Sequence, residues 1–310
     1  MICIEKENML ALITGAEGFV GRHLLNHLTE CGDETITTDI STGGPDLLDQ
    51  NAFLDLFQSV RPDVVYHLAG QADVKESWEN PLKTFRINAE GTLNVLEAAK
   101  SAGVRKVLCI SSSEVYGLVQ ESDLPINELH RLSPSNPYAT SKATAELISA
   151  QYNSSSLEVV IARSFNHFGP GQSENFVTTA LAKRMLLANA RSSTEITVGN
   201  LSTRRDFTDV RDVVRAYRDL ILIGEAGEAY NVCSGRDIMI HDLANALLKH
   251  INSDLALVPD PDLQRPSDIP ALRGDNSKLR DRTNWRPLKE FDESIADIVH
   301  ATQKSLNLSK

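Results

Sequence analysis

Three glycines at a regular spacing most constrain the fold of this 310-residue chain. Gly15, Gly18 and Gly21 follow a short apolar run, Leu10–Ile13, and open a segment with helical periodicity. Glycines between a strand and a helix allow a tight turn, a close approach to a pyrophosphate and close packing of the helix on the sheet. The spacing predicts a dinucleotide-binding turn, and the alternative is a strand–helix turn that binds no ligand. The residues expected at the cofactor here are Gly15, Glu17, Gly18, Phe19, Val20 and Gly21.

Apolar runs and helical patterns alternate through the first half of the chain. The expected strands are Leu10–Ile13, Glu34–Thr38, Val64–His67, Lys106–Ser111 and Glu158–Ala162. The expected helices are Gly21–Thr29, Asn51–Ser59, Phe85–Ala102 and Tyr138–Tyr152. Continuous apolar strands separated by helices indicate a parallel sheet that is covered on both faces. The predicted fold is therefore α/β, a doubly wound parallel sheet of the Rossmann type with a smaller interleaved α/β lobe.

The pattern changes after Arg163, where we expect the smaller lobe to begin. Expected helices are Asn175–Ala190, Asp209–Ile223, Ile240–Ile251 and Ile295–Leu306, and expected strands are Glu195–Val198 and Ala229–Val232. We assign residues 9–163 to a dinucleotide-binding domain, to which residues 196–234 partly return. Residues 164–195 and 235–310 are assigned to a substrate-binding lobe.

Composition excludes several classes of partner. The net charge is −11 and the pI is near 5.2, so neither nucleic acid nor an anionic membrane is expected as a partner. No apolar run approaches the roughly 20 residues of a membrane span. The four cysteines lie far apart, without C-x-x-C spacing or clustered histidines, so we expect a cytoplasmic protein with no metal site.

An acidic residue at the end of the second strand indicates which cofactor binds. Asp39 lies 24 residues after Gly15, where an acid accepts hydrogen bonds from the adenosine ribose and repels a 2′-phosphate. No arginine stands beside it in the sequence, so NAD(H) is favoured, with NADP(H) as the alternative. An ordinary turn aspartate is the other interpretation. Further residues expected along the cofactor are Asp46, Leu47, Leu68, Ala69 and Gly70.

A serine, a tyrosine and a lysine form the predicted reactive set. Ser112 follows the fourth strand, and Tyr138 and Lys142 are four residues apart, one turn of a helix. A phenol has a pKa near 10, and we expect the neighbouring ammonium to lower it so that Tyr138 can act as an acid or base. Alone, the pair would be a helix-start tyrosine and a solvated lysine.

Several longer runs carry a family resemblance. The chain resembles the extended short-chain dehydrogenases/reductases in Thr14–Gly21, His67–Gly70, Asn88–Thr92, Ser111–Gly117 and Tyr138–Lys142. Its second half is most similar to the GDP-4-keto-6-deoxy-D-mannose reductases in Ser164–Ser173, Glu174–Val177, Arg205–Asp212, Tyr230–Gly235 and Arg265–Pro270. The resemblance implies reduction of the C4 keto group of GDP-4-keto-6-deoxy-D-mannose to GDP-D-rhamnose. It also implies a homodimer built through the helices Phe85–Ala102 and Tyr138–Tyr152.

The resemblance also implies individual roles. Ser112, Tyr138 and Lys142 match catalytic positions, and Asn88 matches a structural or cofactor-side asparagine. Residues implied at the GDP-sugar are Ser113, Asn166, Asn175, Phe176, Val177, Lys183, Arg205, Arg265 and Asp268. Arginines suit a diphosphate because their forked donors match its oxygens, whereas a single surface arginine is as often an ion pair.

Glu114 is compatible with activities other than reduction. The related GDP-mannose 4,6-dehydratases use a glutamate at this position to remove a proton at C5, but they carry threonine where this chain has Ser112. Glu114 is therefore expected either to act as a base or to orient sugar hydroxyls. The alternatives to the reductase are a 4,6-dehydratase, a nucleotide-sugar 4-epimerase and a non-catalytic NAD-binding regulator.

Overall fold

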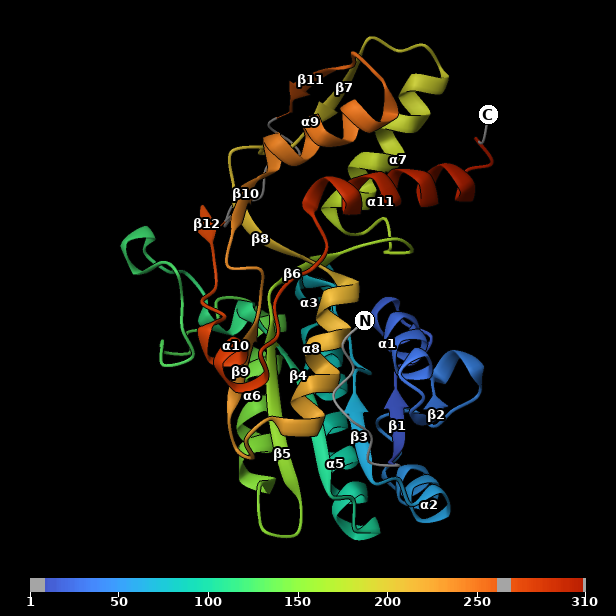
Figure 1. Cartoon of the computed structure of the whole chain (residues 1–310), viewed down its shortest axis with the longest axis vertical. Helices are drawn as coiled ribbons and strands as arrows, with labels where there is room; N and C mark the ends of the chain where they lie inside the picture. Colours follow the sequence, from blue (N-terminus) through green and yellow to red (C-terminus); the bar gives the residue numbers. More distant parts are fainter. Residues whose placement is uncertain (1–8, 261–268, 309–310) are drawn as a thin grey trace.

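A computed structural model describes residues 9–260 and 269–308, and a six-stranded parallel sheet forms its centre (Figure 1). The strand order is β2-β1-β3-β4-β5-β9, which reverses direction at β1 and β3. The strands are β1 (Leu10–Thr14), β2 (Glu34–Thr38), β3 (Val64–His67), β4 (Lys106–Ser112), β5 (Glu158–Ser164) and β9 (Ala229–Val232). This order confirms the predicted doubly wound α/β fold.

Helices cover both faces of this sheet. One face carries α1 (Phe19–Glu30), α8 (Val210–Ile223) and α10 (Ser277–Thr283). The other carries α2 (Gln50–Val60), α5 (Gly91–Ala102) and α6 (Pro137–Tyr152). Because both faces are covered, the inner strands consist almost entirely of buried residues, as their apolar runs predict.

The predicted helix Phe85–Ala102 has a different internal structure. The chain forms α4 (Pro81–Phe85), then a five-residue π-helical segment, η2 (Arg86–Glu90), and then α5. We also did not predict α3 (Val74–Glu79), whose first turn is capped by the Asp73 carboxylate. Both features lie next to the carboxyl ends of the central strands, where a shift of one residue changes which side chains face the site.

The smaller lobe is built from short strands and three longer helices, and it lies at the top of Figure 1. In it, β8 (Arg204–Asp209) pairs with β6 (Asn166–Phe168), β10 (Asp237–Met239) and β12 (Ala271–Leu272), and β7 (Glu195–Val198) pairs with β11 (Ala256–Pro259). Its helices are α7 (Val177–Ala190), α9 (Ile240–Ile251) and α11 (Phe291–Ser305). Single-turn 3₁₀ helices occur at η1 (Ile40–Thr42), η3 (Ser113–Tyr116) and η4 (Glu121–Asp123).

The chain crosses between these two groups of elements more than once. Helix α8 and β9 lie with the six-stranded sheet, whereas β7 and β8 pair with strands of the smaller lobe. We propose that the two groups are the dinucleotide-binding domain and the substrate-binding lobe.

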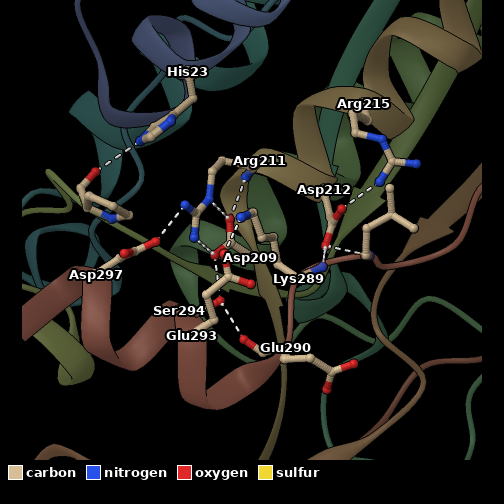
Figure 2. Close-up of polar contacts among 12 residues, drawn as sticks. His23, Asp209, Arg211, Asp212, Arg215, Lys289, Glu290, Glu293, Ser294 and Asp297 are labelled. Carbon is tan, nitrogen blue, oxygen red and sulfur yellow. Dashed lines mark hydrogen bonds and ion pairs between the residues drawn. The ribbon is translucent and has the colours of Figure 1, made fainter. Parts of the chain in front are cut away.

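The first turn of α8 is where the two groups are tied together (Figure 2). Asp209 caps α8 by accepting from the Arg211 N–H at 2.8 Å, and it also accepts from the Ser294 hydroxyl of α11 at 2.6 Å. Arg211 in turn donates to Asp297 of α11 at 2.6 Å. These bonds fix the start of α8 relative to α11, and so to the smaller lobe.

Two further observations concern the described residues alone. Within residues 9–260 and 269–308, no helix combines the length and the apolar character needed to cross a bilayer. The same residues contain no group of three or more His, Cys, Asp or Glu side chains arranged to hold a metal ion.

Candidate active site

A cavity of about 550 Å³ lies at the carboxyl ends of β4 and β5, between the sheet and the smaller lobe. Polar residues gather there because parallel strands all end at the same edge of a sheet. The predicted site residues that line it are Val20, Leu68, Gly70, Ser112, Ser113, Glu114, Tyr138, Lys142, Asn166, Asn175, Phe176, Val177 and Arg205.

Tyr138 and Ser112 form the centre of this cavity. Tyr138 follows Pro137 in the first turn of α6, which Asn136 caps by accepting from the Ala139 N–H at 2.7 Å. Burial raises the pKa of the Tyr138 phenol to about 12, although a hydrogen bond with Ser112 opposes the rise, and the Glu114 charge adds to it. The phenol is therefore fully protonated at neutral pH.

Lys142 lies one turn along α6 and lines the same cavity. Its ammonium donates to the Ile110 carbonyl at 2.7 Å, and burial lowers its pKa to about 8. Our expectation that Lys142 lowers the pKa of Tyr138 was wrong for this state of the protein, because burial of the phenol dominates and raises its pKa.

Glu114 is held against the start of α6. Its carboxylate accepts from the Asn136 side-chain amide at 3.0 Å, and its N–H donates to the Ser112 hydroxyl at 3.2 Å. The residue that caps α6 therefore also orients Glu114, so that the carboxylate and Tyr138 line one cavity.

The glycine turn has the close packing that a dinucleotide requires. A Cβ on Gly15, whose φ is +72°, would lie 2.7 Å from the Ala69 nitrogen, and one on Gly21 would lie 2.3 Å from the Gly15 oxygen. Gly18 begins α1 without a side-chain cap, so the helix N-terminus is left open to an anion. These residues fit a dinucleotide diphosphate.

Asp39 lies beside the glycine turn and close to an arginine that the sequence does not place there. Burial raises the pKa of Asp39, but hydrogen bonds from Ser41 and the Glu17 N–H and the charge of Arg22 lower it, and lowering prevails. The Glu17 N–H donates to Asp39 at 3.1 Å, and Arg22 donates to the Glu17 carboxylate at 3.3 Å. Arg22 reaches this position because α1 returns along the end of β2.

The other predicted cofactor residues are structural in the contacts they make. Leu47 is buried, and its side chain meets the space above Gly91, while Asp46 accepts from the Leu48 N–H at 3.0 Å. Ala69 packs against the core of the α5 face, and its backbone lies beside Gly15.

Asn88 lies behind the cavity, in the π-helical segment. Its side chain accepts from the Gln71 N–H at 2.8 Å and donates to the Gln71 carbonyl at 3.0 Å and to the Ser141 hydroxyl at 2.9 Å. These bonds hold the backbone after β3 against α6, next to Gly70.

Of the basic residues predicted at the substrate, one lines the cavity and one does not. Arg205 lines the cavity and donates to the Ile269 carbonyl at 2.6 Å. Lys183 does not line it and pairs with Glu174, whereas its neighbour Arg184 does line it and donates to Thr197. Arg265 and Asp268 lie outside the described residues.

Ser164 and Tyr217 are among the cavity residues that we did not predict, although the sequence contained a signal for Ser164. Ser164 ends β5 and is the register partner of Ser112, but we expected the strand to stop at Ala162. Tyr217 comes from α8, and nothing in its local sequence distinguishes it from a core tyrosine. Further polar residues of the cavity that we did not predict include Gln71, Asp73, His167, Gln172, Arg184 and Thr203.

Comparison with known proteins shows the family to which the chain belongs. Residues 12–298 match a family model described as GDP-mannose 4,6 dehydratase. The chain is 38% identical to the GDP-6-deoxy-D-mannose reductase of Pseudomonas aeruginosa over 290 residues, which are 93% of this chain and 95% of the relative. It is 27% identical to the human GDP-mannose 4,6 dehydratase over 344 aligned positions, covering 96% of this chain and 92% of the relative.

Solved structures of nucleotide-sugar enzymes have the same fold. A structure of RMD from Pseudomonas aeruginosa complexed with NADPH superposes with a TM-score of 0.88 at 36% identity, covering 96% of this chain and all of that one. The Thermus thermophilus UDP-glucose 4-epimerase in complex with NAD superposes with a TM-score of 0.85 at 29% identity, covering 95% of this chain and 99% of that one.

Proposed function

Since the chain belongs to the GDP-mannose 4,6-dehydratase family of the extended short-chain dehydrogenases/reductases, we propose that it is a GDP-4-keto-6-deoxy-D-mannose reductase. In this proposal it reduces the C4 keto group to give GDP-D-rhamnose. The observation that carries the proposal is the Ser112–Tyr138 pair in a cavity next to a dinucleotide-binding turn.

The protonation state of Tyr138 suits reduction. With a pKa raised to about 12, the phenol carries a proton at neutral pH and can donate it to an alkoxide as that forms. Ser112 would hold the same substrate oxygen, and Lys142 would donate to a cofactor hydroxyl. A bound reduced nicotinamide would provide the hydride, and the cavity between the two lobes would exclude water from the reaction.

In this proposal, two arginines would hold the diphosphate of the nucleotide sugar. Arg184 on α7 and Arg205 on β8 both line the cavity, on the side of the smaller lobe. A guanidinium presents paired donors to phosphate oxygens, which favours a diphosphate in an otherwise acidic protein. Asn166 and the Asn175–Val177 turn would contact the sugar nucleotide alongside them.

The cofactor is a nicotinamide dinucleotide, for which the Gly15–Gly21 turn provides the diphosphate site. Asp39 favours NAD(H) because a carboxylate repels a 2′-phosphate. Arg22 works in the opposite direction, since its charge lies close enough to lower the pKa of Asp39. We therefore propose that NAD(H) is the preferred cofactor. The positive charge of Arg22 would partly offset the repulsion by Asp39, so that NADP(H) can also bind.

A homodimer is proposed through the outer surface of α4 and α6. Leu82 is 72% exposed, Phe85 41% and Leu147 67%, and these helices are in contact with each other. Burying such apolar side chains is the usual basis of a stable interface. The proposed location is the cytoplasm, where a nucleotide sugar and a nicotinamide dinucleotide would meet as dissolved metabolites.

A product assay tests the function. GDP-4-keto-6-deoxymannose and GDP-mannose are supplied separately with NADH or NADPH, absorbance at the nicotinamide band is followed, and the sugar product is identified. The reductase proposal predicts cofactor oxidation with the keto sugar alone. Conversion of GDP-mannose without net cofactor oxidation would instead assign Glu114 a base role and make the protein a 4,6-dehydratase.

A further inference from the structure

The cavity contains a second serine–tyrosine pair next to the catalytic one. The hydroxyls of Ser164 and Tyr217 lie 2.5 Å apart, and both residues line the cavity. Tyr217 is fully buried and Ser164 is 6% exposed. Ser164 and Ser112 are register partners at the ends of adjacent parallel strands, so their backbones lie about 5 Å apart.

The two pairs approach the cavity from opposite faces of the sheet. Tyr138 comes from α6, which packs with α5, whereas Tyr217 comes from α8, which packs with α1. Tyr138 is close enough to raise the pKa of Tyr217 through its charge, which adds to the larger effect of burial. The second pair therefore lies on the side of the cavity that the glycine turn and α1 occupy.

The side chains around this second pair are mostly apolar. Val20 lies within the Gly15–Gly21 turn, Leu68 follows β3 and Ile110 belongs to β4, and all three line the cavity. If the cofactor diphosphate binds at the glycine turn, its nicotinamide ring would extend toward Ser112 and Tyr138 and would lie against these residues. Its polar substituent would then need a hydrogen-bonding partner, because an unpaired amide in such surroundings is costly.

We infer that Ser164 is that partner: its hydroxyl binds the carboxamide of the nicotinamide ring, and Tyr217 is the positioning residue that holds it. The inference rests on the proposed function. If the Tyr217 phenol donates to the Ser164 oxygen, the Ser164 proton remains available for the carboxamide oxygen. Fixing the carboxamide fixes the rotation of the ring, and therefore which of its faces is turned toward Tyr138.

The position of Tyr217 is itself well determined. It lies two turns into α8, and the first turn of that helix is held by Asp209 and Arg211 through Ser294 and Asp297 of α11 (Figure 2). The same turn is also bonded to the segment that precedes α11, because Asp212 accepts from the Leu288 N–H at 2.9 Å and the Lys289 N–H at 2.8 Å. A hydroxyl on a helix anchored in this way is suited to hold Ser164 in one orientation.

The test is a binding measurement without sugar substrate, on the full chain. Dissociation constants are measured for NADPH and NADH, for the ADP-ribose fragment that lacks nicotinamide, and for the 3-acetylpyridine analogue, in which a ketone replaces the amide. Ser164→Ala is expected to weaken binding of both reduced cofactors about fivefold, and Tyr217→Phe about threefold, the range of a single neutral hydrogen bond. The fragment should bind all variants equally.

The acetylpyridine analogue gives the sharper readout. The analogue keeps the carbonyl oxygen but lacks the amide N–H groups, so Ser164→Ala should weaken its binding about as much as it weakens binding of the nicotinamide form. Tyr230→Phe is the matched control, because Tyr230 is fully buried on β9 with its hydroxyl accepting from the Glu225 N–H at 3.0 Å, outside the cavity. This control should bind every ligand as the wild type does.

The outcomes separate this inference from the proposed function. Equal cofactor affinities in wild type and Ser164→Ala, or an equal loss for the ADP-ribose fragment, would overturn the role of Ser164. Absence of cofactor binding by the wild-type protein would overturn the proposed function as well. Unfolding temperatures of the variants show whether a loss of affinity reflects loss of the fold.

Discussion

The two walls of the active-site cavity are built differently. One wall consists of the carboxyl ends of β4 and β5 with α6 across them, and hydrogen bonds link its reactive groups to neighbouring backbone. The other wall belongs to the smaller lobe, where Asn175, Phe176 and Val177 are exposed and Arg184 reaches in from α7. The first wall is suited to position reacting atoms, whereas the second is suited to select a substrate.

The largest effect is expected on the first wall. Tyr138→Phe removes the proton donor without changing the packing of the ring, so turnover should fall about 10²- to 10⁴-fold. Cofactor affinity should change little, because the phenol acts on the substrate oxygen. Steady-state kinetics with the keto sugar and fluorescence titration with NADPH measure the two quantities.

Tyr152→Phe is the control for this variant, because Tyr152 lies at the far end of the same helix and its hydroxyl donates to Glu97. It should keep the wild-type turnover. A Tyr138→Phe enzyme with near-normal turnover would show that Tyr138 is not the acid and would remove the distinction between the two walls.

On the second wall, neighbouring residues provide a matched pair. Arg184→Ala removes a guanidinium that lines the cavity, and loss of a charge-assisted hydrogen bond to a phosphate should raise the KM for the GDP-sugar on the order of 10-fold to 100-fold. Lys183→Ala should change the KM less than about twofold, since Lys183 forms a surface pair with Glu174. Turnover at saturation should stay close to the wild type in both. A large rise in KM for Lys183→Ala with little change for Arg184→Ala would show that Lys183, and not Arg184, binds the diphosphate.

Lys183 and Arg184 also show which features of the site cannot be predicted from the sequence. Strand ends are predictable where a continuous apolar run marks a buried strand, as β4 does for Ser112 at the carboxyl edge of the sheet. Lys183 and Arg184 differ by about 100° around α7, so an error of one residue moves the predicted cation out of the cavity. The rotation of α7 about its axis depends on tertiary packing, because its sequence has no pronounced apolar face that would reveal which side is buried.

Dependence on tertiary packing also explains why the surroundings of Asn88, Arg22 and Tyr217 were not predicted. The π-helical segment that contains Asn88 changes the period of a helix for a single turn, and no composition signal marks that change. Arg22 approaches Asp39 only because α1 packs beside β2, so the charge that opposes Asp39 in cofactor choice is invisible in the local sequence. Tyr217 lies on a strongly amphipathic helix, where a tyrosine on the apolar face is ordinarily a core residue.

Lys142, on the first wall, is expected to make cofactor binding depend on pH. Burial lowers its pKa to about 8 in the free protein, so the ammonium loses its proton as the pH rises through that value. If only the charged form binds the cofactor ribose, affinity should be constant below pH 7 and fall about tenfold between pH 7 and 9, which is the protonation linkage for one group. Titrations of NADH binding across this range measure it.

Neighbouring groups do not titrate in the same range. Burial lowers the pKa of His67 to about 3 and raises that of Cys109 to about 11. Lys142→Met should therefore bind cofactor more weakly and show a flat profile from pH 7 to 9. A wild-type profile that is equally flat would mean that Lys142 does not contact the cofactor in its charged form.

The smallest effect is expected beside the glycine turn, outside both walls, where Arg22 and Asp39 act on cofactor choice in opposite directions. The Arg22 side chain is 68% exposed, so its contribution to a 2′-phosphate contact is that of a screened surface pair. Arg22→Ala should lower the preference for NADPH over NADH about twofold to fivefold, and Asp39→Asn should shift it the other way because the repelling charge is gone. Affinities for both cofactors decide this. If Arg22→Ala weakens NADH and NADPH equally, Arg22 serves only to hold Glu17, and Asp39 alone discriminates between the cofactors.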